Sequence, residues 1–119
     1  MKSIKLFDSE LKLMEILWAI EPISAKQLHV LVTEKIGWNK NTTYTILKKL
    51  IEKKVVLREN PNFICSTLIK KEDIQKAETE SLIAKLYGGS KKAFFAAFLE
   101  SESLSETDIA DLKAMIEKR

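Results

Sequence analysis

The segment NKNTTYTILKKLIEKKVVLRENPNFICST, residues 39–67, changes its hydrophobic period from helical to extended. Its first half spaces apolar residues as a helix does, and Asn39 belongs to the residue types that cap helix starts. A helix is therefore predicted from Asn39 to about Lys53. Residues 55–58 and 63–67 are β-rich runs joined by the turn-forming link ENPN. The segment predicts a helix followed by a β-hairpin.

Two further helices are predicted upstream of this segment. The first covers about residues 9–20, where apolar residues recur at helical spacing. The second opens at a capping box made by Ser24 and Gln27, and Gly37 supplies the left-handed residue that ends it. Three short helices and a hairpin, in this order, are the components of a winged helix-turn-helix domain, which we place at residues 1–71.

Residues 72–119 are predicted to form a separate helical region, so the expected fold class is mainly α with a small β-hairpin. Three Phe residues within five positions, 94–98, exceed what a thin helical region needs for its own packing. An exposed apolar stripe of this kind indicates a protein interface, and helix-turn-helix repressors usually act as two-fold dimers. Packing of these rings onto the N-terminal domain is the alternative. The predicted dimerisation residues are Leu82, Leu86, Phe94, Phe95, Phe98, Leu99, Ile109, Leu112, Met115 and Ile116.

The charge is divided unevenly along the chain. Residues 1–71 contain 13 Lys/Arg and 7 Asp/Glu, whereas residues 72–119 contain 7 and 10, so the halves carry +6 and −3. A basic half followed by an acidic half indicates that the first meets a polyanion and the second meets protein. Scattered surface charge is the alternative explanation.

The polar face of the helix after Asn39 carries the chemistry that suits the DNA major groove. Asn can pair with adenine, Thr can contact bases or phosphates, and Lys can reach phosphates or a guanine edge. Glu52 does not fit this set, because phosphates repel a carboxylate. An ordinary amphipathic surface helix is the alternative. The predicted DNA contacts are Asn41, Thr42, Tyr44, Thr45, Lys48 and Lys49, with Arg58 from the hairpin.

Several classes of function lack support in the sequence. Cys65 is the single cysteine and His29 the single histidine, so we expect no disulfide, metal or cofactor site. Neither a Gly-rich phosphate loop nor a nucleophile motif is present, and no enzyme activity is expected. The sequence also lacks an apolar run of membrane-spanning length and an N-terminal signal peptide, so a cytoplasmic protein without membrane insertion is predicted.

The whole chain resembles the BlaI/MecI penicillinase-repressor family. The resemblance rests on Asp8-Ser9-Glu10-Leu11, Met14, Leu17-Trp18, Ile23-Ser24-Ala25, Trp38, Thr42, Thr45, Leu47, Leu50, Leu86-Tyr87, Gly89-Ser90, Phe98-Leu99 and Leu104-Ser105. It implies a dimeric winged-helix repressor that binds a palindromic operator in double-stranded DNA, often at antibiotic-resistance genes. A winged-helix protein-interaction module and a ligand-responsive regulator remain the alternatives.

The resemblance also implies a form of regulation. Some family members are inactivated when a membrane-bound sensor protease cuts the dimerisation region at an Asn-Phe bond. The corresponding bond here is Ala97–Phe98, so this chain departs from the pattern at the residue before the cut. Paired C-terminal cysteines, which mark a copper-responsive branch, are absent from the sequence.

Overall fold

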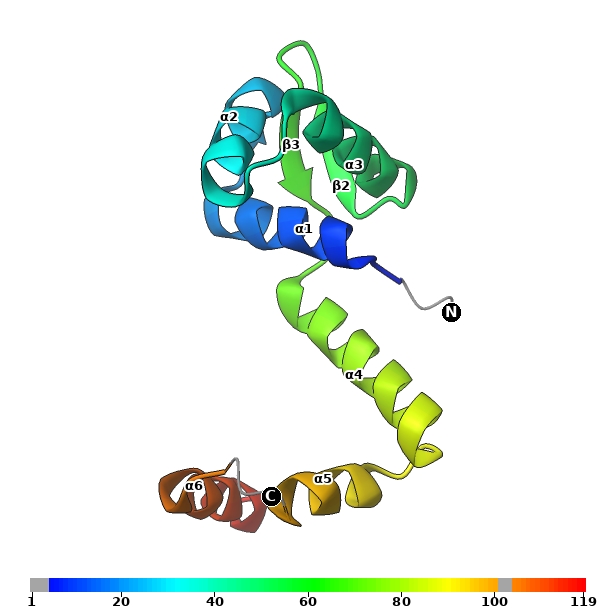
Figure 1. Cartoon of the computed structure of the whole chain (residues 1–119), viewed down its shortest axis with the longest axis vertical. Helices are drawn as coiled ribbons and strands as arrows, with labels where there is room; N and C mark the ends of the chain where they lie inside the picture. The colour runs from blue at the N-terminus through cyan, green and yellow to red at the C-terminus, as the bar shows by residue number, and fades with distance from the viewer. Residues whose placement is uncertain (1–4, 101–103) are drawn as a thin grey trace. The chain divides into compact units, whose positions relative to one another are not determined.

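A computed structural model describes residues 5–100 and 104–119, and within these ranges the chain is mainly helical with a small antiparallel sheet (Figure 1). The elements are α1 (Asp8–Ile20), β1 (Ile23–Ser24), α2 (Ala25–Ile36), α3 (Lys40–Glu52), β2 (Val56–Glu59), β3 (Ile64–Thr67), α4 (Lys71–Tyr87), α5 (Lys91–Glu100) and α6 (Glu106–Glu117). The chain divides within α4 into two units, Met1–Glu78 and Thr79–Arg119. The predicted fold class is confirmed.

The turn between α2 and α3 follows from residues recognisable in the sequence. The Ser24 hydroxyl accepts a hydrogen bond from the Gln27 N–H at 3.2 Å, which caps α2. Gly37 ends α2 with φ 76°, a left-handed conformation that costs glycine little. The Asn39 side chain then accepts a hydrogen bond from the Thr42 N–H at 2.8 Å and caps α3. These caps fix where α3 begins.

The start of α1 uses a different device. Phe7 is the N-cap residue, and its N–H donates to the carboxylate of Glu10 at 2.8 Å. The helix therefore begins at Asp8, one residue before the predicted start. Glu10 holds the chain at the entry to α1 although no Ser, Thr or Asn cap precedes it.

The sheet has the order β1-β3-β2, and β1 was not predicted. β2 and β3 form the predicted hairpin, while β1 pairs with the other edge of β3 through Ile23 opposite Cys65 and Ser24 opposite Ile64. The Ala25 N–H also donates to the Phe63 carbonyl at 2.9 Å. The hairpin is thus anchored to the start of α2.

One apolar core lies among α1, α2, α3 and the sheet, and Ile74 of α4 joins it. Its largest members include Leu13, Met14, Leu17, Leu28, Leu47, Leu50 and Val55. On α3 the inward residues Thr43, Leu47 and Leu50 are buried, and Ile46 and Ile51 are half-buried. Because one side of α3 packs in the core, the opposite side faces solvent.

Cys65 lies in this core, fully buried in β3. From this burial we expect the protein to lose stability at alkaline pH. Burial raises the pKa of its thiol from 9.0 to about 11, although the charge of Arg58 lowers it in part. Above pH 9 the unfolded chain loses this proton while the folded chain keeps it, so stability falls until the pH passes the folded pKa. The free energy of unfolding should therefore decrease by about 1.4 kcal/mol for each pH unit in this window.

Denaturant titrations of the wild type and Cys65→Ala at several pH values from 8 to 11 measure this effect. The difference between the two proteins should change with pH above 9, because other titrating groups are common to both. Parallel stability curves would show that the thiol ionises equally easily in the folded and unfolded chains.

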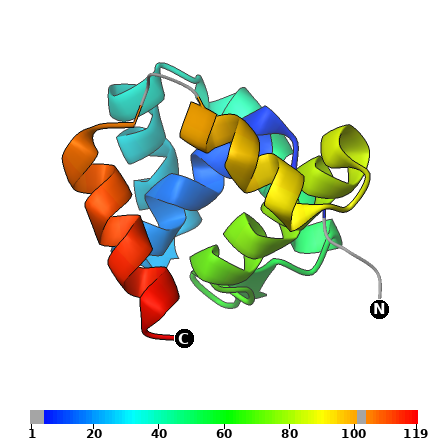
Figure 2. The same ribbon diagram turned by 90° about the horizontal axis from the view of Figure 1, so that it is seen from below.

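The unit Thr79–Arg119 contains the end of α4 together with α5 and α6 (Figure 2). Ser90 and Ser105 each accept a hydrogen bond from a backbone N–H three residues ahead, at 3.0 Å in both cases, and so cap α5 and α6. Neither α5 nor α6 buries any of its described side chains. Among the described residues, no helical segment combines the length and the apolar character that a membrane span requires.

Candidate nucleic-acid interface

The exposed face of α3 carries five of the predicted DNA contacts. They are Asn41, Thr42, Thr45, Lys48 and Lys49, all exposed to solvent. Within residues 5–100 and 104–119, none of these five side chains makes a hydrogen bond or ion pair. The face therefore presents hydrogen-bond donors and acceptors that have no partner within the protein. A helix that enters the major groove needs such free groups to contact base edges and phosphates.

Tyr44, the sixth predicted contact on α3, is placed differently. Its ring is half-buried and lies 5.9 Å from the His29 ring on α2 and 6.1 Å from the ring of Phe63, the residue before β3. The ammonium of Lys40 lies 5.9 Å from the centre of the Tyr44 ring. Tyr44 thus connects α2, α3 and the hairpin through its ring, in addition to any contact that its hydroxyl makes.

Arg58 is exposed on β2, and its guanidinium lies 4.1 Å from the centre of the Phe63 ring. Stacking of this kind holds the planar guanidinium in a defined orientation. Phe63 itself has φ 50°, a left-handed conformation that nothing in its sequence context signals. Arg58 was predicted as a contact from its residue type, whereas no local pattern marks Phe63 as the ring that holds it.

A groove separates α3 from the hairpin. Its lining combines Tyr44, Ile51 and Phe63, which are half-buried, with the exposed side chains of Lys48, Glu52 and Arg58. Glu52, the carboxylate that does not suit DNA, lines this groove together with the cations Lys48 and Arg58. The predicted contacts from the helix and from the hairpin are thus brought to one surface.

The local charge of this surface favours an anionic partner. Residues 39–58 contain six Lys or Arg, of which Lys53 is paired with Glu10, and a single carboxylate, Glu52. Lys48, Lys49 and Arg58 are exposed cations on the helix and the hairpin. A surface with this balance attracts phosphates over several ångströms and positions a helix on the DNA backbone.

A second exposed surface lies in the unit Thr79–Arg119. A groove between α5 and α6 is lined by Phe95, Leu99, Leu112, Met115, Ile116 and Arg119. The Phe94 ring lies against Tyr87, Phe95 and Phe98 at centroid distances of 5.5, 5.6 and 4.7 Å. Of the predicted dimerisation residues, Phe94 and Leu112 are half-buried, and the exposed ones are Leu82, Leu86, Phe95, Phe98, Leu99, Ile109, Met115 and Ile116.

Metal binding has no support in the described parts of the chain, where no group of three His, Cys, Asp or Glu side chains could hold an ion. His29 instead contacts the Tyr44 ring, and Cys65 is a core residue. Lys71 is a cation at the end of the predicted DNA-binding domain. It forms an ion pair with Glu15 at 2.9 Å, so its charge is not free to meet a phosphate.

The arrangement of α1, α2, α3 and the hairpin defines a winged-helix protein. The solved DNA-binding domain of the repressor BlaI matches it with a TM-score of 0.55 and 23% identity, over 60% of this chain and 90% of that one. A multiple antibiotic-resistance repressor (MarR) from Listeria monocytogenes 4b F2365 matches with a TM-score of 0.54 and 23% identity, over 95% and 72% of the two chains. These likenesses establish the fold.

The particular family follows from the sequence. The model of the penicillinase repressor family matches residues 6–118, and the chain therefore belongs to that family. It is 27% identical to a penicillinase repressor of Staphylococcus aureus, over 97% of this chain and 93% of the relative. It is also 25% identical to the methicillin resistance regulatory protein MecI of Staphylococcus epidermidis, over 99% and 98%. The predicted resemblance is confirmed, and the family consists of repressors, not enzymes.

Proposed function

We propose that this protein is a transcriptional repressor that binds double-stranded DNA as a homodimer, with α3 in the major groove of a palindromic operator. The observation that carries the proposal is the exposed face of α3, whose five polar side chains have no partner in the described structure. Relatives named as penicillinase and methicillin-resistance regulators support a target of the antibiotic-resistance type. A DNA partner places its action in the cytoplasm.

The two parts of the chain have separate roles in this proposal. Residues 1–71 bind DNA through the exposed face of α3 and through Tyr44 on the same helix, and Arg58 of the hairpin adds a further contact. Residues 72–119 form the dimer, so that two copies of α3 meet the two half-sites of the operator. The grooved and largely apolar surface of α5 and α6 supports this division.

Regulation by a membrane-bound sensor protease is the part of the proposal that rests on resemblance alone. The bond between Ala97 and Phe98 lies inside α5, and both residues are exposed. Because proteases bind extended chain, cleavage at this bond requires local unfolding of α5. In the single chain α5 is short and has no buried side chain, which favours such opening.

Selection of bound sequences from random DNA, together with the solution mass of the protein, tests the proposal. We expect a palindromic sequence and a mass twice that of the 13.6 kDa chain. With Lys48, Lys49 and Arg58 of both protomers on phosphates, log K should fall against log salt concentration with a slope of about −5. Affinity for the selected operator should therefore fall about a thousandfold between 50 and 200 mM salt.

The alternatives give different results in the same measurements. A winged-helix module that binds protein through α3 would select no palindromic sequence and would protect no site from nuclease. A ligand-responsive regulator would bind DNA but would respond to an effector, for which the groove between α5 and α6 is the available site. An effector found by thermal shift that changes DNA affinity would replace proteolysis as the mode of regulation.

A further inference from the structure

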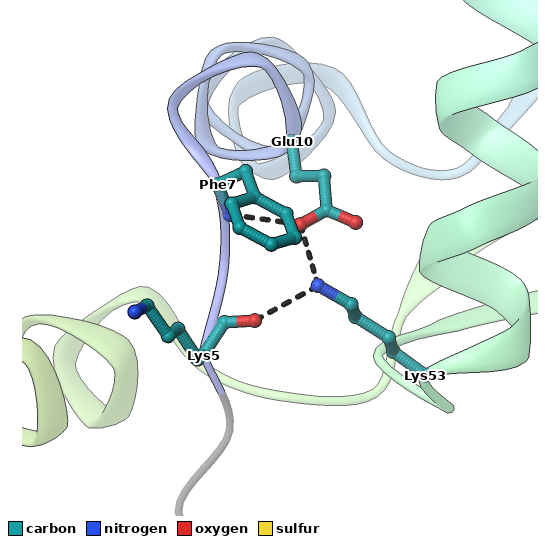
Figure 3. A network of polar contacts seen from close by, with 4 residues as sticks. All are labelled: Lys5, Phe7, Glu10 and Lys53. Atoms are coloured by element: carbon teal, nitrogen blue, oxygen red, sulfur yellow. Dashed lines mark hydrogen bonds and ion pairs between the residues drawn. The ribbon is translucent and has the colours of Figure 1, made fainter.

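The position of Lys53 near the end of α3 suggests one more DNA contact, but its side chain binds Glu10 and Lys5 instead. Thr42, Lys49 and Lys53 follow one another at intervals of seven and four residues, which places them along one edge of the helix. The Lys53 ammonium, however, lies 2.6 Å from Oε1 of Glu10 on α1 and donates to the Lys5 carbonyl at 2.9 Å (Figure 3). It also lies 4.6 Å from the centre of the Phe7 ring.

Glu10 is the buried partner in this contact. Its side chain is 1% exposed, and Oε1 accepts from the Phe7 N–H as well as from Lys53. Its other oxygen, Oε2, is buried and has no hydrogen bond among the residues described. A buried carboxylate is stable only when a cation neutralises it, and Lys53 is the cation at Glu10. The two side chains therefore cannot move far apart without a large cost in free energy.

The pair joins the ends of two helices whose dipoles favour it. Glu10 lies in the first turn of α1, where the dipole stabilises a negative charge, and Lys53 is the C-cap residue of α3, where it stabilises a positive one. Asn39 caps the other end of α3. A slide of α3 by one helical turn, about 5.4 Å, would break the contact and leave the buried carboxylate of Glu10 without its cation.

We infer that Glu10 and Lys53 are positioning residues, which fix the end of α3 against the start of α1 and so set the angle at which α3 meets DNA. This inference rests on the proposed function. Neither residue needs to touch DNA for its role. Loss of the pair should weaken recognition of the operator more than it weakens binding to unrelated DNA, since only the former depends on exact placement of α3.

Glu10→Gln and Glu15→Gln form a matched pair of variants for the test. Both remove one negative charge from α1, but Glu15 is half-exposed and pairs with Lys71 instead. We expect the ratio of operator to non-operator affinity to fall about tenfold in Glu10→Gln and to stay unchanged in Glu15→Gln. The measurement is made well below the unfolding temperature of either variant, so that a general loss of stability does not alter the ratio.

Lys53→Gln, with Lys71→Gln as its control, separates positioning from phosphate contact. A positioning role predicts a reduced affinity ratio with the salt slope of the control. A phosphate contact would instead lower affinity for both DNAs equally and make the slope shallower by about 0.9 for each protomer, which would overturn the inference. If either single variant fails to fold, the neutral double variant Glu10→Gln/Lys53→Gln buries no unmatched charge and should show the same reduced ratio.

The outcomes distinguish this inference from the function on which it rests. Wild-type protein that selects no DNA sequence would contradict the proposed function itself. Wild-type protein that binds its operator, while Glu10→Gln retains the affinity ratio of Glu15→Gln, would contradict only the positioning role. A double variant with a wild-type ratio would do the same.

Discussion

Replacing Thr45 and Lys48 together by Ala is expected to weaken operator binding by about a hundredfold or more, while leaving the fold and the dimer intact. Each well-placed contact of this kind contributes a factor of about ten in affinity, or about 1.4 kcal/mol, and both side chains lie on the exposed face of α3. Neither has a hydrogen bond or ion pair in the described structure, so their loss should barely change stability. Band-shift titration of the operator measures the effect.

Lys76→Ala/Thr79→Ala is the matched control for this variant. It removes the same two residue types at the same spacing from exposed positions on α4. Operator affinity should then change only by the small amount that one distant positive charge contributes. Operator affinity as high in the Thr45/Lys48 variant as in this control would mean that α3 is not the recognition helix.

The start of α3 could be predicted from sequence because local residues determine it. Asn39 caps the helix, and Gly37 provides the left-handed turn before it. Apolar residues at helical spacing predicted one inward side of this helix, and the structure buries Thr43, Leu47 and Leu50 there. The opposite side remained as the candidate interface. Signals that act over three or four residues are visible without knowledge of the fold.

Features that depend on distant residues were missed. β1 is two residues long, too short to show a period of two, and exists because β3 offers a free edge beside it. The pair between Glu10 and Lys53 joins residues 43 positions apart, and no local pattern marks either as a partner. Tyr44 is a similar case, because its ring contacts come from His29 on α2 and from Phe63, which precedes β3.

Replacing Ile116 by Glu is expected to convert the dimer into monomers and to weaken operator binding by at least about a hundredfold. Ile116 is 71% exposed and lines the groove between α5 and α6 with Met115, which is 62% exposed. A charge on this surface cannot be buried against a second copy without a large desolvation cost. Each monomer must then bind its half-site independently. The affinity that a dimer gains, because its second α3 is already held beside the second half-site, is lost.

Ala114→Glu is the control, because it adds the same charge to α6 on the side away from Leu112 and Ile116. Analytical ultracentrifugation should give twice the 13.6 kDa chain mass for the wild type and for Ala114→Glu, and the single chain mass for Ile116→Glu. Both variants should keep the binding of a single α3 to an isolated half-site, since residues 1–71 are unchanged. A dimeric Ile116→Glu protein would place the dimer interface on another face, and a monomeric wild type would exclude the two-fold binding proposed for the operator.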